Sequence, residues 1–141
     1  MIEEGLYRFL LSNTAIQDVI PTTNSVFMGE VPESASYPCI VFWKISGMHD
    51  TTFDGPSGYV ERRYQFTCLG KEDPQFPGSG YVSAQKVADV LRQQMNGLTG
   101  TLPDGTQLFN SILDNEVDIY DDDGMTHNAI QDYIISFSQH P

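Results

Sequence analysis

Six carboxylates lie close together near the C-terminal end of the sequence and are the strongest candidates for a chemical role. They are Asp114, Glu116, Asp118, Asp121, Asp122 and Asp123. Clustered carboxylates can bind Ca²⁺, but an EF-hand loop aligned on Gly124 would need acidic residues at Ile119 and Ile130. The favoured interpretation is a solvated acidic turn, with a weak, exposed divalent-cation site as the alternative.

The histidines and cysteines do not form a reactive pattern. His49, His127 and His140 are scattered, and none has a second ligand at metal-binding spacing. Cys39 and Cys68 lie in apolar stretches without zinc-ligand spacing, so we expect reduced thiols in the core. The segment 78–80 has two glycines but lacks the lysine of a phosphate-binding loop. From these patterns we expect no enzyme, no metal and no cofactor.

Length and charge restrict the classes of partner. A chain of 141 residues with 40% hydrophobic content is expected to form one domain, residues 1–141, with a single core. Nineteen acidic against seven basic residues give a net charge of −12, which disfavours binding to nucleic acid or anionic membranes. With no long apolar run and no basic leader, we expect a soluble, cytoplasmic product.

The elements that position these residues are organised around one helix, predicted over residues 81–96. Its apolar positions recur at helical spacing and are Ala84, Val87, Ala88, Leu91 and Met95. Ser79 or Ser83 is expected to cap its start, and Gly97 to close its end in a left-handed conformation. One face of this helix must therefore be buried against a sheet.

The remaining pattern predicts an α+β fold with an antiparallel sheet of four to five strands and a short N-terminal helix pair. Strands are expected at 39–46, 59–69, 108–120 and 129–138, with a short candidate at 26–28 and a bulge near Asp114. In the first hairpin, paired residue numbers are expected to sum to 107. That register places Lys44 opposite Arg63. It also places the large apolar side chains of both strands on one face, where they are expected to be buried with those of the helix: Val41, Trp43, Tyr64, Phe66, Val87 and Leu91.

The segment 47–58, between the first two strands, is far longer than a hairpin loop requires. It carries glycines, a proline and two apolar side chains. We therefore predict a contact arm for a protein partner. The candidate contact residues are Met48, His49, Phe53 and Asp54.

The order of elements resembles that of the tail-completion, or tail-terminator, proteins of long-tailed bacteriophages. The resemblance is carried by the helix pair at 3–11 (EEGLYRFLL) and 15–21 (AIQDVIP), by 37–42 (YPCIVF), and by 64–67 (YQFT) leading to 83–91 (SAQKVADVL). These stretches are hydrophobic patterns spread over nearly the whole chain. The acidic stretch matches no family motif.

The resemblance implies a structural protein of the virion with no catalytic residues to transfer. It would cap the tail tube, end its growth and join tail to head as a ring of six copies. Its partners would be other copies, the tail tube protein and the head–tail connector proteins, and it would assemble in the host cytoplasm. The six carboxylates would then line or rim the ring opening, or face outward. The alternative class is a ligand-binding or enzyme domain with a site built from Trp43, Tyr64, His49 and Asp54.

Overall fold

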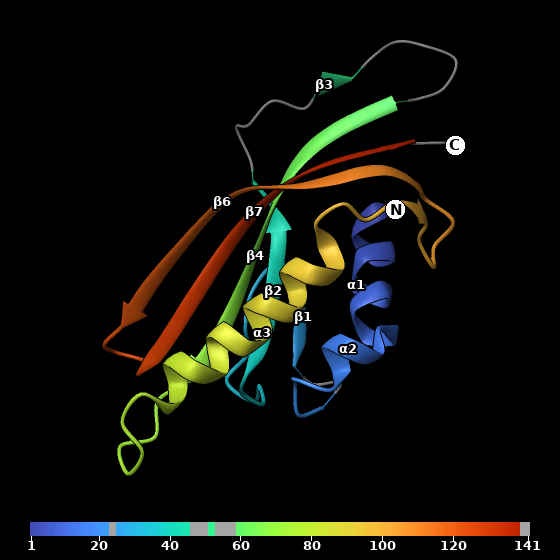
Figure 1. Ribbon diagram of the computed structural model, residues 1–141. Coiled ribbons are helices and arrows are strands. Elements are labelled where there is room, and N and C mark those ends of the chain that lie inside the picture. The colour runs from blue at the N-terminus through green and yellow to red at the C-terminus, as the bar shows by residue number, and fades with distance from the viewer. Residues whose placement is uncertain (23–24, 46–50, 53–58, 139–141) are drawn as a thin grey trace.

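Three helices lie on one face of a curled sheet in the described part of the chain (Figure 1). The computed structural model describes residues 1–22, 25–45, 51–52 and 59–138. The helices are α1 (Ile2–Ser12), α2 (Thr14–Gln17) and α3 (Ser79–Met95). The strands are β1 (Val26–Met28), β2 (Cys39–Lys44), β3 (Thr51–Thr52), β4 (Tyr59–Lys71), β5 (Gly100–Thr101), β6 (Gln107–Asp121) and β7 (Thr126–Ser138). The α+β class, the N-terminal helix pair and the long helix are confirmed.

The sheet differs from the expected antiparallel sheet of four to five strands. Six strands follow the order β1-β2-β4-β7-β6-β5, and β3 adds a short pairing to β4. The sheet is mixed because β1 runs parallel to β2. The connector 29–38 carries the chain back to the end of the sheet where β1 began, so β2 starts beside Ser25, whose carbonyl accepts from the Ile40 N–H at 2.8 Å.

The predicted register of β2 and β4 is wrong by one residue. Ile40 pairs with Cys68 and Phe42 with Phe66, so paired numbers sum to 108. A shift of one residue moves every side chain of a strand to the other face. The stacked rings of Phe42 and Phe66, 5.0 Å apart, therefore face the helices, while Trp43 is 37% exposed on the opposite face. Lys44 pairs with Tyr64 instead of Arg63.

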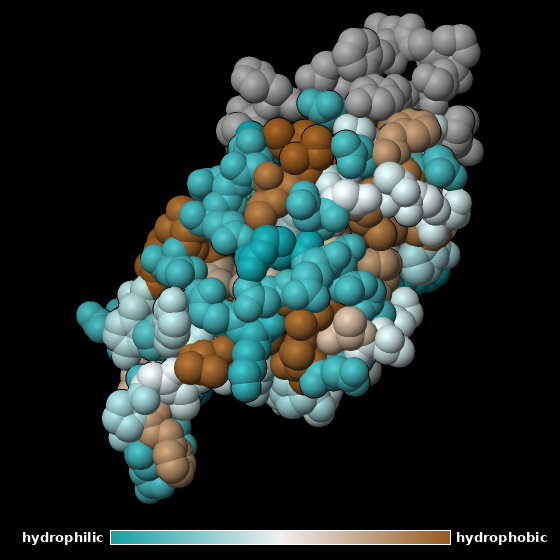
Figure 2. Space-filling view, viewed as in Figure 1, coloured by the Kyte–Doolittle hydropathy of each residue, from teal (hydrophilic) through white to brown (hydrophobic). Residues whose placement is uncertain are grey.

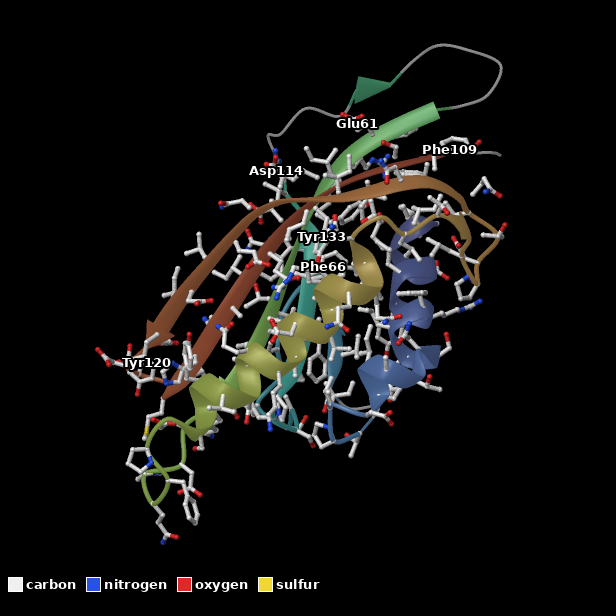
Figure 3. All side chains as sticks on the ribbon, in the orientation of Figure 1. Glu61, Phe66, Phe109, Asp114, Tyr120 and Tyr133 are labelled. Atoms are coloured by element: carbon white, nitrogen blue, oxygen red, sulfur yellow. The ribbon has the colours of Figure 1, made fainter. Side chains whose placement is uncertain are left out.

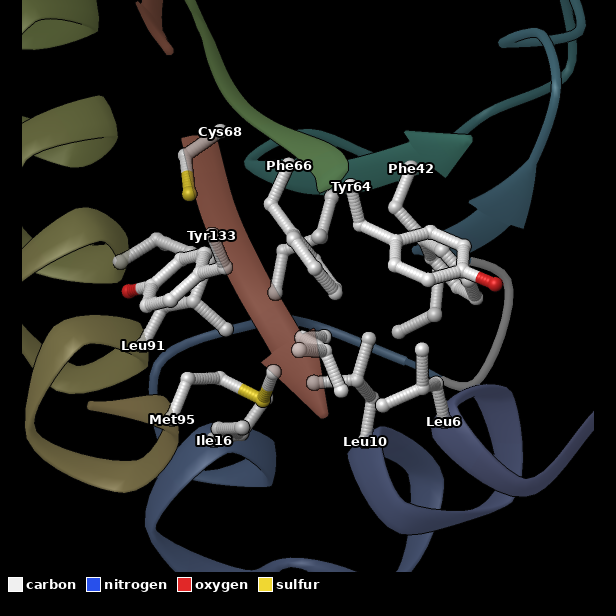
Figure 4. Packing of buried hydrophobic residues seen from close by; sticks show 14 of the residues in the cluster. Leu6, Leu10, Ile16, Phe42, Tyr64, Phe66, Cys68, Leu91, Met95 and Tyr133 are labelled. Atoms are coloured by element: carbon white, nitrogen blue, oxygen red, sulfur yellow. The ribbon is translucent and has the colours of Figure 1, made fainter. Parts of the chain in front are cut away.

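The core lies between the helices and the face of β4 and β7 that they cover (Figure 4). Tyr64, Phe66 and Tyr133 meet Leu91 of α3 there, and all four are fully buried. The predicted burial of Tyr64, Phe66, Val87 and Leu91 is confirmed. The prediction for Trp43 is wrong, and Val41, although only 4% exposed, belongs to the opposite face and not to this cluster.

The start of α3 is capped by a residue from outside the helix and not by Ser79 or Ser83. Glu72, just after β4, accepts from the backbone N–H groups of Gly78 and Gly80 at 3.0 and 2.8 Å. These hydrogen bonds lower the pKa of Glu72. At Gly70 a Cβ atom would lie 2.1 Å from the Gly80 carbonyl oxygen, so the close packing of β4 against α3 requires glycine.

The other end of α3 and both cysteines follow the sequence predictions. Gly97 has φ of 82°, the left-handed conformation expected after the helix. Cys39 and Cys68 are buried free thiols. Burial raises the pKa of Cys39 to about 12 and also raises that of Cys68, so both remain protonated.

Candidate functional site

Strand β6 lies near one margin of the sheet and is long and poorly covered. It pairs with β7 along its whole length, whereas β5 pairs only with Gln107 and Leu108. The turn after α3 adds two hydrogen bonds: the Gly97 N–H donates to the Ser111 carbonyl at 2.6 Å, and the Leu113 N–H donates to Asn96 Oδ1 at 3.0 Å. Beyond Leu113, the second edge of β6 has no strand partner among the described residues. Such edges are natural sites for pairing with another chain.

Large apolar side chains are exposed along this strand. The exposed set is Phe109, Ile112, Val117, Ile119 and Tyr120. Figure 2 shows hydrophobic side chains gathered at the molecular margin that β6 occupies in Figure 1. Val117 and Ile119 pair with Ile130 and Asn128, which places them on the sheet face opposite the helices, here called the outer face. Contiguous exposed apolar side chains of this kind mark interaction surfaces.

The predicted bulge near Asp114 is confirmed, and it divides β6 into two halves. Before the bulge, Leu108 faces the helices opposite Phe137 and is buried. After it, Glu116, Asp118 and Tyr120 face the helices, while Val117 and Ile119 face outward. Beyond the bulge, the aliphatic side chains of β6 therefore lie on the outer face alone.

The structure places the six carboxylates on different surfaces. Asp114 forms an ion pair with Arg63 on the outer face at 2.5 Å (Figure 3 shows Asp114). On the helix face, Arg92 of α3 donates to Glu116 at 2.7 Å, and Gln85 of α3 donates to Asp118 at 3.0 Å. The remaining three, Asp121, Asp122 and Asp123, are exposed at the tip of the β6–β7 hairpin, where Asp121 is the last residue of β6. Asp114, Glu116 and Asp118 therefore link β6 to β4 and α3, and the carboxylates at the tip of the hairpin are exposed to solvent.

The outer face also carries a second carboxylate beside Arg63. Burial raises the pKa of Asp132, Arg63 opposes that rise, and the charge of Asp114 adds to it. The Oδ1 atom of Asp132 is buried without a hydrogen-bond partner in the described structure. One arginine thus balances two carboxylates on a sheet face that none of the described helices covers.

A buried polar network holds α3 against the strand pair. Gln131 of β7 donates to the Ala88 carbonyl at 2.9 Å and accepts from the Tyr133 hydroxyl at 2.6 Å. It also lies 3.4 Å from Glu116, the partner of Arg92. Burial raises the pKa of Tyr133, so the hydroxyl keeps its proton and donates. Sequence reasoning missed Gln131, although a polar residue in the apolar row from Ala129 to Phe137 was a visible signal.

The candidate contact residues Met48, His49, Phe53 and Asp54 lie outside the described residues. For the alternative ligand site, the structure separates the two described members. Trp43 is on the outer face, whereas Tyr64 is buried on the helix face and donates to Glu3 at 2.5 Å. These two side chains cannot line one pocket.

The described ranges contain neither a candidate metal centre nor a membrane-spanning helix. No group of three or more His, Cys, Asp or Glu residues there has a geometry that could hold a metal ion. No helix of that part is both long and apolar enough to cross a bilayer.

Comparison with known proteins gives a clear family assignment. A search of curated proteins gave no match. Among solved structures, a chain of the "Virion of native gene transfer agent (GTA) particle" has the same fold, with a TM-score of 0.67. The two chains are 9% identical, and the match covers 95% of this chain and 92% of that one. The profile of the family described as "Tail completion protein gp17" matches residues 4–138. Because this match spans nearly the whole sequence, the chain belongs to the tail completion protein gp17 family.

Proposed function

We propose that this protein forms a ring that caps the phage tail tube, ends its growth and joins the tail to the head. The observation that carries the proposal is the family match over residues 4–138, which supports a structural role in a phage tail. The fold shared with a chain of a gene transfer agent virion is consistent with that role.

The exposed part of β6 suits one side of a ring contact. A closed ring requires two different complementary patches on each subunit. The margin of β6 from Asp114 to Asp121, with Val117 and Ile119, offers an unpaired edge and apolar side chains. Helix α1 lies on the opposite flank of the molecule in Figure 1, so the second patch belongs on that side. By family resemblance the ring contains six copies.

The other partners are the tail tube protein and the head–tail connector proteins. The ring would sit at the head-proximal end of the tail in the virion, after assembly in the host cytoplasm. The segment 47–58 remains our candidate arm for one of these partners, on the sequence argument alone.

The proposed acidic lining of the ring opening centres on the turn Asp121–Asp123. Asp114 and Glu116 are paired with arginines, which reduces the negative field they present to solvent. The three turn residues are exposed and have no basic partner in the described structure. Like charge between this turn and passing DNA would prevent tight phosphate contacts.

Removing the gene from the phage that encodes this chain tests the proposal. Electron microscopy of the lysate should then show filled heads without tails, together with free tail tubes of irregular length. Supplying the wild-type chain in trans should restore joined particles. Tails of normal length attached to heads in the absence of the protein would contradict the proposed function.

The β6 contact can be tested in the same complementation assay. The double variant Val117→Lys, Ile119→Lys should keep the fold, because both side chains are exposed, but fail to restore joined particles. Gln93→Lys, an exposed position on α3, is the matched control and should restore them. Full complementation by the double variant would exclude β6 as a ring contact.

A further inference from the structure

A small cavity of about 180 Å³ lies between the start of α3 and the β6–β7 hairpin. Its lining includes Tyr81 and Gln85 from α3, Asp118 and Tyr120 from β6, and His127 from β7. Drug-sized ligands occupy pockets of about 300–1,000 Å³, and one water molecule takes about 30 Å³. The cavity therefore has the size for one side chain.

Three rings form the wall of this cavity. The Tyr120 and His127 rings lie 4.5 Å apart, and the Tyr81 ring meets His127 edge-on at 5.7 Å. Figure 3 shows Tyr120 at the end of the hairpin that lies beside the start of α3. Tyrosine rings present a negative face, which attracts a cation placed over it.

The remaining lining supplies acceptors for hydrogen bonds. Asp118 accepts one bond from Gln85, and the rest of its carboxylate is available to a ligand. Of the described lining residues, none is Lys or Arg. Beyond His127, Glu72 adds a further carboxylate 3.9 Å from the imidazole.

We propose that this cavity is a socket for one arginine side chain presented by a different, basic protein. A guanidinium stacks on aromatic rings and pairs with a carboxylate, which matches the three rings and Asp118. Exposed apolar side chains near the start of α3 and in the β6–β7 turn offer contacts to the rest of the partner. They are Phe76, Val82 and Met125.

A second copy of the chain is a poor source of this arginine. Of the four arginines in the sequence, Arg62, Arg63 and Arg92 are engaged in ion pairs within the chain. A second copy could present only Arg8, an exposed residue of α1. The socket does not depend on the ring, because its chemistry fits any basic partner.

The probe for this site is N-acetyl-arginine amide, with N-acetyl-citrulline amide as its uncharged isostere. In NMR titrations we expect saturable shifts of the ring signals of Tyr81, Tyr120 and His127 with the arginine compound. The citrulline compound should give none. Asp118→Asn should weaken binding about tenfold, the range expected for a hydrogen bond to a charged group. Asp122→Asn removes the same charge from the neighbouring turn, outside the cavity, and should change affinity less than twofold.

Three results would overturn the proposal. The first is equal binding of citrulline, because the site would then not select a cation. The second is equal weakening by Asp118→Asn and Asp122→Asn, because binding would then reflect a general acidic surface. The third is a shift of the same ring signals on concentrating the protein without probe, lost in Arg8→Ala, because a second copy would then fill the socket.

Discussion

Strands β4 and β6 are both long and rich in apolar residues, yet they have opposite roles. β4 has β2 and β3 on one side and β7 on the other, and its row Tyr64, Phe66 and Cys68 is fully buried. β6 has β7 on one side, and beyond its bulge the apolar side chains are exposed, with Ile119 at 52%. The amino-acid composition of both segments favours strands. Their position in the sheet decides whether the apolar side chains are buried in the core or stay exposed for contact with another chain.

Truncation of one side chain in each strand should give the largest contrast. Phe66→Ala removes a fully buried ring stacked on Phe42 and should cost about 3–5 kcal/mol of unfolding free energy. Ile119→Ala removes an exposed side chain and should change it by no more than about 0.5 kcal/mol. Urea denaturation of the isolated protein measures both. Equal losses would mean that β6 is buried in solution and that the contrast between the strands is wrong.

Removing one tyrosine hydroxyl from the core and one from the exposed half of β6 should give a second, smaller contrast in stability. Tyr133→Phe removes a hydroxyl and leaves the buried Gln131 oxygen without its donor, which should cost about 1–3 kcal/mol. Tyr120→Phe makes the same chemical change on the exposed half of β6. It should leave the unfolding midpoint almost unchanged. If both variants unfold alike, the Gln131 network does not contribute to holding α3.

Sequence reasoning found α3, the long strands and the bulge of β6 because each leaves a local periodic pattern. It failed where two arrangements satisfy the same pattern. In β2 the pair Val41 and Trp43 and the pair Ile40 and Phe42 are both apolar, so alternation alone could not choose the face. The parallel pairing of β1 depends on the path of the connector 29–38, which no local spacing encodes.

The candidate site was predictable in position but not in its contacts. The carboxylates of β6 were visible in the sequence, whereas their partners Arg63 and Arg92 come from other elements. The cap of α3 was missed for the same reason. Glu72 lies several residues before the helix, and only the folded loop between them brings its carboxylate to the Gly80 N–H. Contacts between side chains that are distant in the sequence can be identified only once the fold is known.

The cap supplied by Glu72 predicts a pH-dependent effect. Hydrogen bonds from Gly80 and Gly78 lower the pKa of this carboxylate in the folded protein. A group with a depressed pKa stabilises the fold above its unfolded-state pKa, and this contribution is lost as pH falls through the folded value. Glu72→Gln should therefore be less stable than the parent at neutral pH, by less than Tyr133→Phe is.

At acid pH, below the folded pKa of Glu72, the parent and Glu72→Gln should unfold at the same urea concentration. Thermal or urea unfolding across this pH range is the measurement. A difference that stays constant with pH would show that the carboxylate charge does not stabilise the start of α3. The exposed variant Asp73→Asn, next to Glu72, is the control and should show little change at either pH.

Substitutions in the acidic turn should give the smallest change in stability. Measuring both unfolding and DNA ejection then separates a role in folding from a role in function. Replacing Asp121, Asp122 and Asp123 with Lys alters exposed residues at the end of β6, so the unfolding midpoint should barely move.

If the turn rims the ring opening, the added lysines will attract passing phosphates and slow DNA ejection. The slowing should be greater at low salt, where screening is weaker. Placing the same substitutions at Asp18, Glu30 and Glu33, exposed acidic residues elsewhere, gives an equal change in net charge and should not slow ejection. Particles that contain the substituted ring and eject DNA at the normal rate at low salt would place the turn away from the opening.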